Sequence, residues 1–245
     1  WMGPGPYKIG AFEANRFITY DRRADWWAKD LAINKGRFNY GSIRYDVYRD
    51  QTVAREAFKS GQYDFRSENS AREWAVFYDF PAVQQGLVKK VEIAHERPSG
   101  LSGFIYNTRR EKFQDPRVRR ALTLAYDYEW ANKTFFYNSY QRSSSYFENS
   151  AFAARGEPSA EELKLLEPYR DQLPKEVFGP AYQAPVSDGT GVDRKNLREA
   201  ARLLKEAGWV VREGKLHNAR GEAFVIEFLL GDPTYERIVA PWGQA

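Results

Sequence analysis

Apolar residues alternate with polar ones in the first part of the chain. This pattern predicts two strands joined by a short turn within residues 5–20, followed by a loop over residues 22–41. Ile43, Tyr45 and Val47 then occupy every second position, as expected for a strand with one buried face. The chain therefore begins with β structure.

A helix is predicted directly after this strand. Asp50 is placed to cap it, and Ser60-Gly61 supplies a stop signal. Residues 63–65 are predicted to begin another strand, so that residues 43–65 form a β-α-β unit. Further strands are expected at residues 88–94 and 104–107.

Helical spacing dominates the remaining predicted elements. Asp115-Pro116 opens a helix with a regular apolar stripe, and Ser159 with Glu162 forms a capping box. The other expected elements are a short aromatic helix at 71–80, a linker at 179–190, a helix at 193–208, a hairpin at 215–230 and a helix from Pro233 onward. Because strands and helices do not alternate regularly, the pattern favours an α+β fold with a mixed sheet.

Composition excludes several classes of function. The chain contains no cysteine, which rules out disulfides and thiolate chemistry, and its formal charge of +4 is scattered, which argues against nucleic acid. No apolar run approaches the roughly 20 residues of a membrane helix, and the N-terminus lacks the features of a signal peptide.

Catalytic and metal-binding patterns are equally scarce. The only two histidines, His95 and His217, have no second ligand at metal spacing, and no phosphate-binding or nucleophile motif occurs, so neither a metal nor a cofactor is expected. A glycosidase needs only two carboxylates and no fixed local spacing, so a carbohydrate hydrolase that uses Glu68, Glu73 or Glu148 stays open as an alternative. An interaction domain without a polar site is a third possibility.

Several segments together resemble the extracellular solute-binding proteins of the peptide/nickel family (family 5), which serve ABC importers. The segments that carry the likeness are Gly5-Pro6-Tyr7 with Ile18-Thr19-Tyr20 and Asp25-Trp26-Trp27, residues 52–65, residues 104–108 and residues 113–122. Residues 66–81 and 143–150 resemble the Yej-type oligopeptide-binding members in particular.

The resemblance implies a fragment of the second lobe of a two-lobed periplasmic binding protein (type II, cluster C-like). Residues 1–41 are expected to be hinge strands associated with the first lobe, and residues 42–245 the ligand-binding second lobe, truncated at its C-terminus. A complete family member is longer at both ends. A signal peptide for export is expected to lie outside this sequence.

The same resemblance implies a function without catalysis. The parent protein is expected to be a periplasmic monomer that captures oligopeptides and delivers them to an inner-membrane ABC permease and its ATPase. Such capture needs hydrogen bonds and stacking surfaces rather than a reactive group.

Candidate peptide-binding residues lie mostly in the loop after residue 65. We expect Arg66 to bind a carboxylate, Glu68 a basic group and Asn69 a backbone amide, while Trp74 supplies apolar or aromatic contact. Second-rank candidates are Tyr106, Asn107, Tyr146 and Phe147. Two alternatives remain: Trp74 and Phe147 belong to the core instead, and Arg66 forms a local salt bridge.

Overall fold

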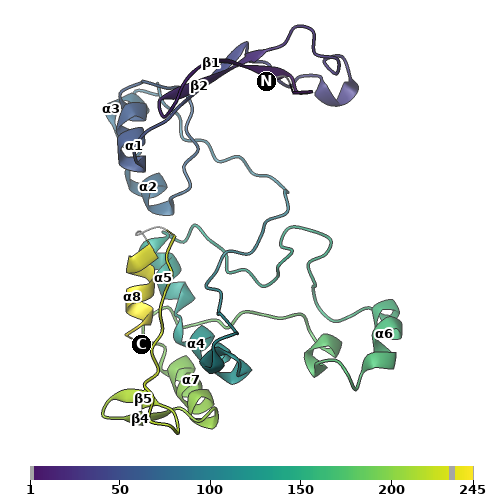
Figure 1. Ribbon diagram of the computed structural model, residues 1–245, viewed down its shortest axis with the longest axis vertical. Helices are drawn as coiled ribbons and strands as arrows, with labels where there is room; N and C mark the ends of the chain where they lie inside the picture. The colour runs from purple at the N-terminus through teal and green to yellow at the C-terminus, as the bar shows by residue number, and fades with distance from the viewer. Residues whose placement is uncertain (1–2, 232–234, 245) are drawn as a thin grey trace. The chain divides into compact units, whose positions relative to one another are not determined.

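The chain divides into two compact units. The structure, a computed structural model, describes residues 3–231 and 235–244 (Figure 1). The sheet unit comprises Trp1–Ser67 and Phe80–Val88, and the helical unit comprises Glu68–Asp79 and Lys89–Ala245.

The sheet unit is built on three antiparallel strands in the order β1-β2-β3. These are β1 (Tyr7–Glu13), β2 (Phe17–Arg22) and β3 (Ser42–Asp46). The β1–β2 hairpin confirms the strand pair predicted within residues 5–20. Since β3 pairs with β2, the expected domain boundary between residues 41 and 42 falls inside one sheet.

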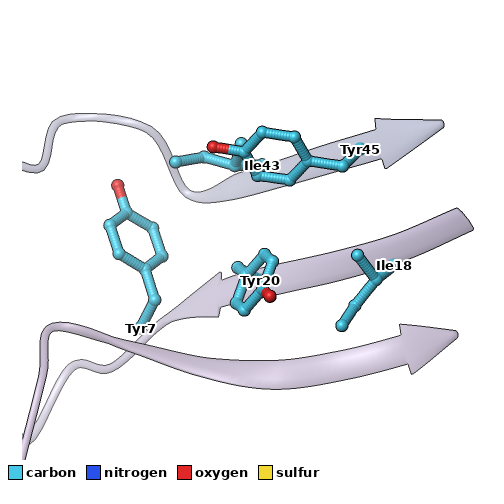
Figure 2. Close-up of a pocket in the computed structure, with 5 residues that line it drawn as sticks. All are labelled: Tyr7, Ile18, Tyr20, Ile43 and Tyr45. Atoms are coloured by element: carbon cyan, nitrogen blue, oxygen red, sulfur yellow. The ribbon is translucent and has the colours of Figure 1, made fainter. Parts of the chain in front are cut away.

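One face of this sheet carries a shallow hollow of about 360 Å³ lined by side chains from all three strands. Figure 2 shows Tyr7, Ile18, Tyr20, Ile43 and Tyr45 around it. The register explains the grouping, because Ile18 lies opposite Tyr45 and Tyr20 opposite Ile43. Every residue of the three strands is described, and none is buried.

Short helices complete the sheet unit. The 3₁₀ turn η1 (Ala32–Asn34) lies in the predicted loop, α1 (Gln51–Lys59) follows β3, and α3 (Pro81–Gln84) starts at Pro81. Asp50 accepts a hydrogen bond from the Val53 amide, which confirms the predicted cap of α1.

The predicted β-α-β unit is wrong, because residues 63–65 are not a strand. The Tyr63 hydroxyl instead donates to the Ala54 carbonyl of α1 (2.7 Å), and its ring lies 5.3 Å from that of Phe58. Tyr63, whose aromatic side chain favoured a strand, instead packs against α1.

The helical unit has its core between α4 (Pro116–Ala125) and α7 (Arg194–Glu206), which pack against each other (Figure 1). Val118 and Ala121 are 1% and 0% exposed, and Leu203 and Leu204 meet them from α7. Asp115 and Asp193 cap the two helices, as their positions in the sequence predict.

The helical unit contains further, smaller elements. They are α2 (Ala71–Val76), η2 (Glu111–Phe113), α5 (Tyr128–Phe135), α6 (Ala160–Leu166), η3 (Glu167–Tyr169), η4 (Lys175–Phe178), β4 (Val210–Arg212), β5 (Lys215–His217) and α8 (Glu236–Trp242). The capping box at Ser159 and Glu162 is formed, and residues 179–190 are irregular, both as predicted.

Three further predictions need correction. Residues 88–94 and 104–107 form no strand. The main hairpin of this region is β4–β5 around Gly214, and residues 218–221 are spanned by a single bridge between His217 and Ala223. The helix expected at 71–80 is shorter, because α2 ends at Val76 and Pro81 begins the separate helix α3.

The last predicted helix lies close to its expected position. The helix expected from Pro233 is present as α8 from Glu236, while Pro233 itself lies outside the described residues. Among the described residues, no helix is long and apolar enough to cross a membrane.

Candidate peptide-binding site

Arg66 is the one candidate residue that belongs to the sheet unit. Its guanidinium donates to the Tyr63 hydroxyl (3.1 Å) and to the Gln51 side-chain oxygen (2.9 Å), so it is held against α1. Both of these acceptors are neutral groups.

Glu68 and the cap of α2 fix the start of the candidate loop in the helical unit. The Glu68 carboxylate accepts hydrogen bonds from the Ser70 amide and the Tyr78 hydroxyl, each 3.0 Å long. Ser70 in turn caps α2 by accepting from the Glu73 amide. This arrangement sets the orientation of α2 and of the tryptophan it carries.

Trp74 is half-buried between charged groups of opposite sign. Its indole N–H donates to Glu92 (3.2 Å), and the Lys90 ammonium lies 4.6 Å from the ring centroid while donating to the Trp74 carbonyl. The Tyr78 ring lies 5.9 Å away. The resulting surface combines an aromatic face with both a cation and an anion.

Asn69 is exposed, and its backbone is anchored to a distant segment. The Tyr140 hydroxyl donates to the Asn69 carbonyl (3.4 Å). Tyr140 is fixed by α5, because the Asn132 side chain bonds both its amide and its carbonyl. The candidate loop is thereby joined to residues 140–142.

Tyr106 and Asn107 occupy different environments. The Tyr106 ring packs on Phe113, 5.5 Å between centroids, and against the core, and burial raises the pKa of its hydroxyl. Asn107 is exposed and accepts from the Arg109 amide in a tight turn. Tyr106 therefore presents its ring to the core rather than to solvent.

Tyr146 and Phe147 are displayed by a loop that Glu148 closes. The Glu148 carboxylate accepts from the Ser144 and Ser145 amides (2.8 and 3.0 Å), and these bonds hold the pKa of Glu148 below its usual range. Tyr146 is 73% exposed and Phe147 is 56% exposed. Phe147 is thus a surface residue, contrary to the alternative that placed it in the core.

The same geometry disfavours Glu148 as a catalytic acid. A glycosidase acid needs a raised pKa so that it is protonated near neutral pH. Glu148 is instead kept ionised, and Glu68 is engaged with Ser70 and Tyr78. Among the described residues, no cluster of three or more histidines or acids is arranged to hold a metal.

Sequence reasoning missed Lys90, Glu92 and Tyr140. Lys90 and Glu92 lie in a segment interpreted as a strand, and Tyr140 is one of 16 tyrosines. Only their contacts with Trp74 and Asn69 in the folded chain distinguish them.

Comparison with known proteins identifies the family. Residues 1–244 match the family model described as bacterial extracellular solute-binding proteins, family 5 Middle. The chain is 44% identical to the "Probable peptide-binding protein YejA" of Agrobacterium fabrum and 43% identical to the "Uncharacterized protein YejA" of Escherichia coli K12. These matches cover 99% and 98% of the chain but 40% of each relative, and they confirm the likeness to the Yej type.

A solved structure agrees in fold. NikA from Brucella suis, crystallised with Fe(III)-EDTA, is similar with a TM-score of 0.61 over 99% of this chain and 40% of that one, at 20% sequence identity. The mixed helix and sheet expected from the sequence is confirmed. The family consists of solute-binding proteins, which confirms a binding protein rather than the alternative hydrolase. The chain belongs to family 5 of the bacterial extracellular solute-binding proteins.

Proposed function

We propose that the full-length protein captures oligopeptides in the periplasm and delivers them to an inner-membrane ABC permease with its ATPase. The observation that carries the proposal is the 44% identity over nearly the whole chain to a relative named as a probable peptide-binding protein. The chain spans about 40% of that relative, so it supplies only part of the binding surface.

The groups around Trp74 suit a peptide ligand. An extended peptide offers amides, carbonyls and varied side chains, so its receptor needs main-chain partners together with adaptable stacking surfaces. The exposed Asn69, the Trp74 ring with Lys90 and Glu92, and the outward-facing Tyr146 meet that need. We assign the peptide-binding role to the eight candidate residues Arg66, Glu68, Asn69, Trp74, Tyr106, Asn107, Tyr146 and Phe147.

Native mass spectrometry of the full-length protein purified from its host tests this function. Bound masses that fragment as peptides are expected, and added oligopeptides should raise the melting temperature, because a ligand that binds only the folded state stabilises it. Co-purified sugars, or turnover of an added peptide or glycan, would contradict the proposal.

A variant pair locates the site. Trp74→Ala is expected to weaken peptide binding about tenfold or more, as buried tryptophans at interfaces commonly do. Trp27→Ala is the matched control, because Trp27 is a more exposed indole in the sheet unit and is not a candidate residue. Equal affinities of both variants and the parent would remove Trp74 from the site.

A further inference from the structure

Arg142 lies against an aromatic ring and a backbone carbonyl. It is half-buried, its guanidinium carbon lies 5.3 Å from the centroid of the Tyr128 ring, and it donates one hydrogen bond to the Pro185 carbonyl. Stacking on the ring and the bond to Pro185 restrict the side chain. The guanidinium is therefore held in one place before any ligand arrives.

The positive charge of Arg142 has no acidic partner within the described parts of the chain, residues 3–231 and 235–244. No carboxylate there lies within 4.0 Å of it, and the Pro185 carbonyl is its only hydrogen-bond acceptor among those residues. Most of its five N–H donors are thus available.

The acids nearest in sequence to Tyr128 are committed elsewhere. Asp127 and Glu129 both accept hydrogen bonds from Ser187, and Asp127 also accepts from the Gly191 amide (2.8 Å). These bonds fix the loop that carries Pro185. The two carboxylates organise this loop and form no ion pair with Arg142 within the described residues.

The Arg142 charge acts electrostatically on three phenol groups. The Arg142 charge acts on the hydroxyls of Tyr106, Tyr126 and Tyr128, opposing the rise in pKa that burial causes in each. Burial still raises the pKa of Tyr126 to about 12, so that phenol stays protonated at neutral pH and keeps a proton to donate. Asp127 and Glu129 act on Tyr126 and Tyr128 with the opposite sign, so the only cation among the described residues that acts on all three phenols stands against acids that Ser187 already binds.

Arg142 also lies on the segment that connects the candidate peptide-binding residues. Tyr140, two residues before it, bonds the Asn69 carbonyl. Ser144, two residues after it, opens the loop that Glu148 closes and that displays Tyr146. Arg142 thus lies in the sequence between the residue that anchors Asn69 and the loop that carries Tyr146.

We propose that Arg142 binds a carboxylate group of the captured peptide, an inference that rests on the proposed peptide-binding function. The planar guanidinium matches both oxygens of a carboxylate, and charge-assisted bonds of this kind are among the strongest in proteins. The carboxylate comes either from the peptide's C-terminus or from an acidic side chain. This role is separate from that of Arg66, which lies in the sheet unit.

Calorimetric titration of the full-length protein with three ligands tests the proposal. The ligands are tetra-alanine with a free C-terminus, its C-terminal amide, and the same amide with one alanine replaced by glutamate. Arg142→Gln is expected to weaken binding of a carboxylate-bearing ligand by roughly 10- to 100-fold while leaving the amidated tetra-alanine nearly unchanged.

Two further variants calibrate the measurement. Arg142→Lys keeps the charge but lacks the planar guanidinium, so it should lose less affinity than Arg142→Gln. Arg170→Gln is the matched control, because the Arg170 guanidinium lies 4.1 Å from the Phe178 ring centroid but is already paired with Glu167. Its affinities should stay within about twofold of the parent.

The pattern of losses decides the outcome. A loss confined to tetra-alanine with a free end identifies the C-terminal carboxylate, and a loss confined to the glutamate peptide identifies a side chain; either supports the proposal. Unchanged binding of all ligands, or an equal loss for all three, overturns it, the latter showing that Arg142 only holds the Pro185 loop. If the unaltered protein binds none of these peptides, the proposed function fails and the inference fails with it.

Discussion

The two compact units use their apolar residues in different ways. In the helical unit, α4 and α7 bury Val118, Ala121 and Leu203 between them. In the sheet unit, the three strands are paired, with one shift of register between Ile9 and Phe12, yet Tyr45 is 58% exposed and the hollow that it lines is shallow (Figure 2).

The two units are therefore stabilised by different interactions. Helices α4 and α7 are held by burial, which contributes most of the stability of a folded domain. Strands β1–β3 are held within this chain by backbone hydrogen bonds and cross-strand side-chain pairs, each of which contributes little. The helical unit should therefore be far more sensitive to the loss of a single side chain.

The largest expected effect is that of Leu203→Ala in α7. Removing a leucine that is 7% exposed leaves a cavity against α4, and such truncations cost about 2–5 kcal/mol. Urea unfolding of the full-length protein measures this change. The control is Leu165→Ala in α6, where the side chain is 75% exposed and a change within about 0.5 kcal/mol is expected. Similar losses for the two variants would show that α4–α7 packing is not what stabilises the unit.

The cap of α7 is expected to make stability depend on pH. Asp193 accepts from the Asn196, Lys195 and Asp188 amides, and these bonds, that of Asn196 foremost, lower its pKa below the usual 3.8. Because the folded pKa is depressed, the contribution is fully present above the unfolded value and is lost as pH falls through the folded value.

Asp193→Asn tests this dependence. The variant should melt at a lower temperature than the parent at neutral pH, and the difference should shrink below about pH 4. Asp171→Asn, at an exposed position, corrects for the change in net charge. A difference that stays constant from neutral to acidic pH would assign the effect of Asp193 to geometry rather than to its charge.

A smaller effect is expected in the sheet. Tyr45→Ala removes a ring that pairs with Tyr20 at 5.8 Å, and loss of such a cross-strand contact costs about 0.5–1 kcal/mol. Differential scanning calorimetry of the full-length protein measures it. A loss several times larger would mean that other parts of the full-length protein cover this face, which would remove the contrast between the units.

The smallest effect is expected on the surface of the helical unit. Arg220 forms ion pairs with Glu111 and Glu222, and all three side chains are largely exposed. Arg220→Gln should lower the melting temperature only slightly, and the difference should vanish at about 1 M salt because exposed charges are screened. A salt-independent loss would show that Arg220 contributes through packing of its stem.

Helices in this chain could be predicted from sequence because their signals are local. Asp50, Asp115, Ser159 and Asp193 each cap the helix that follows, as expected from residues within one turn. The strand predictions were wrong where pairing depends on residues far away in the sequence. Residues 88–94 have strand-like composition, but pairing depends on a partner that the nearby sequence cannot specify.

The candidate site shows the same contrast between residues with a local sequence signal and residues without one. Glu68 and Trp74 lie on one short segment, and the structure brings Tyr78, Lys90 and Glu92 to them. Arg142 could not be found from sequence, because Tyr128 and Pro185, which give it its environment, lie 14 and 43 positions away. The peptide-binding roles of the candidate residues stay predictions until variants are measured.

The segments at residues 88–94 and 104–107 affect how the chain behaves in solution. They have no partner strand among the described residues, and Val91, Ile93 and Ile105 are exposed. Such edges act as templates for strand addition from another molecule. Solutions of this polypeptide should therefore self-associate as concentration rises, and a gatekeeping charge at Val91→Lys should delay that assembly without touching α4 or α7.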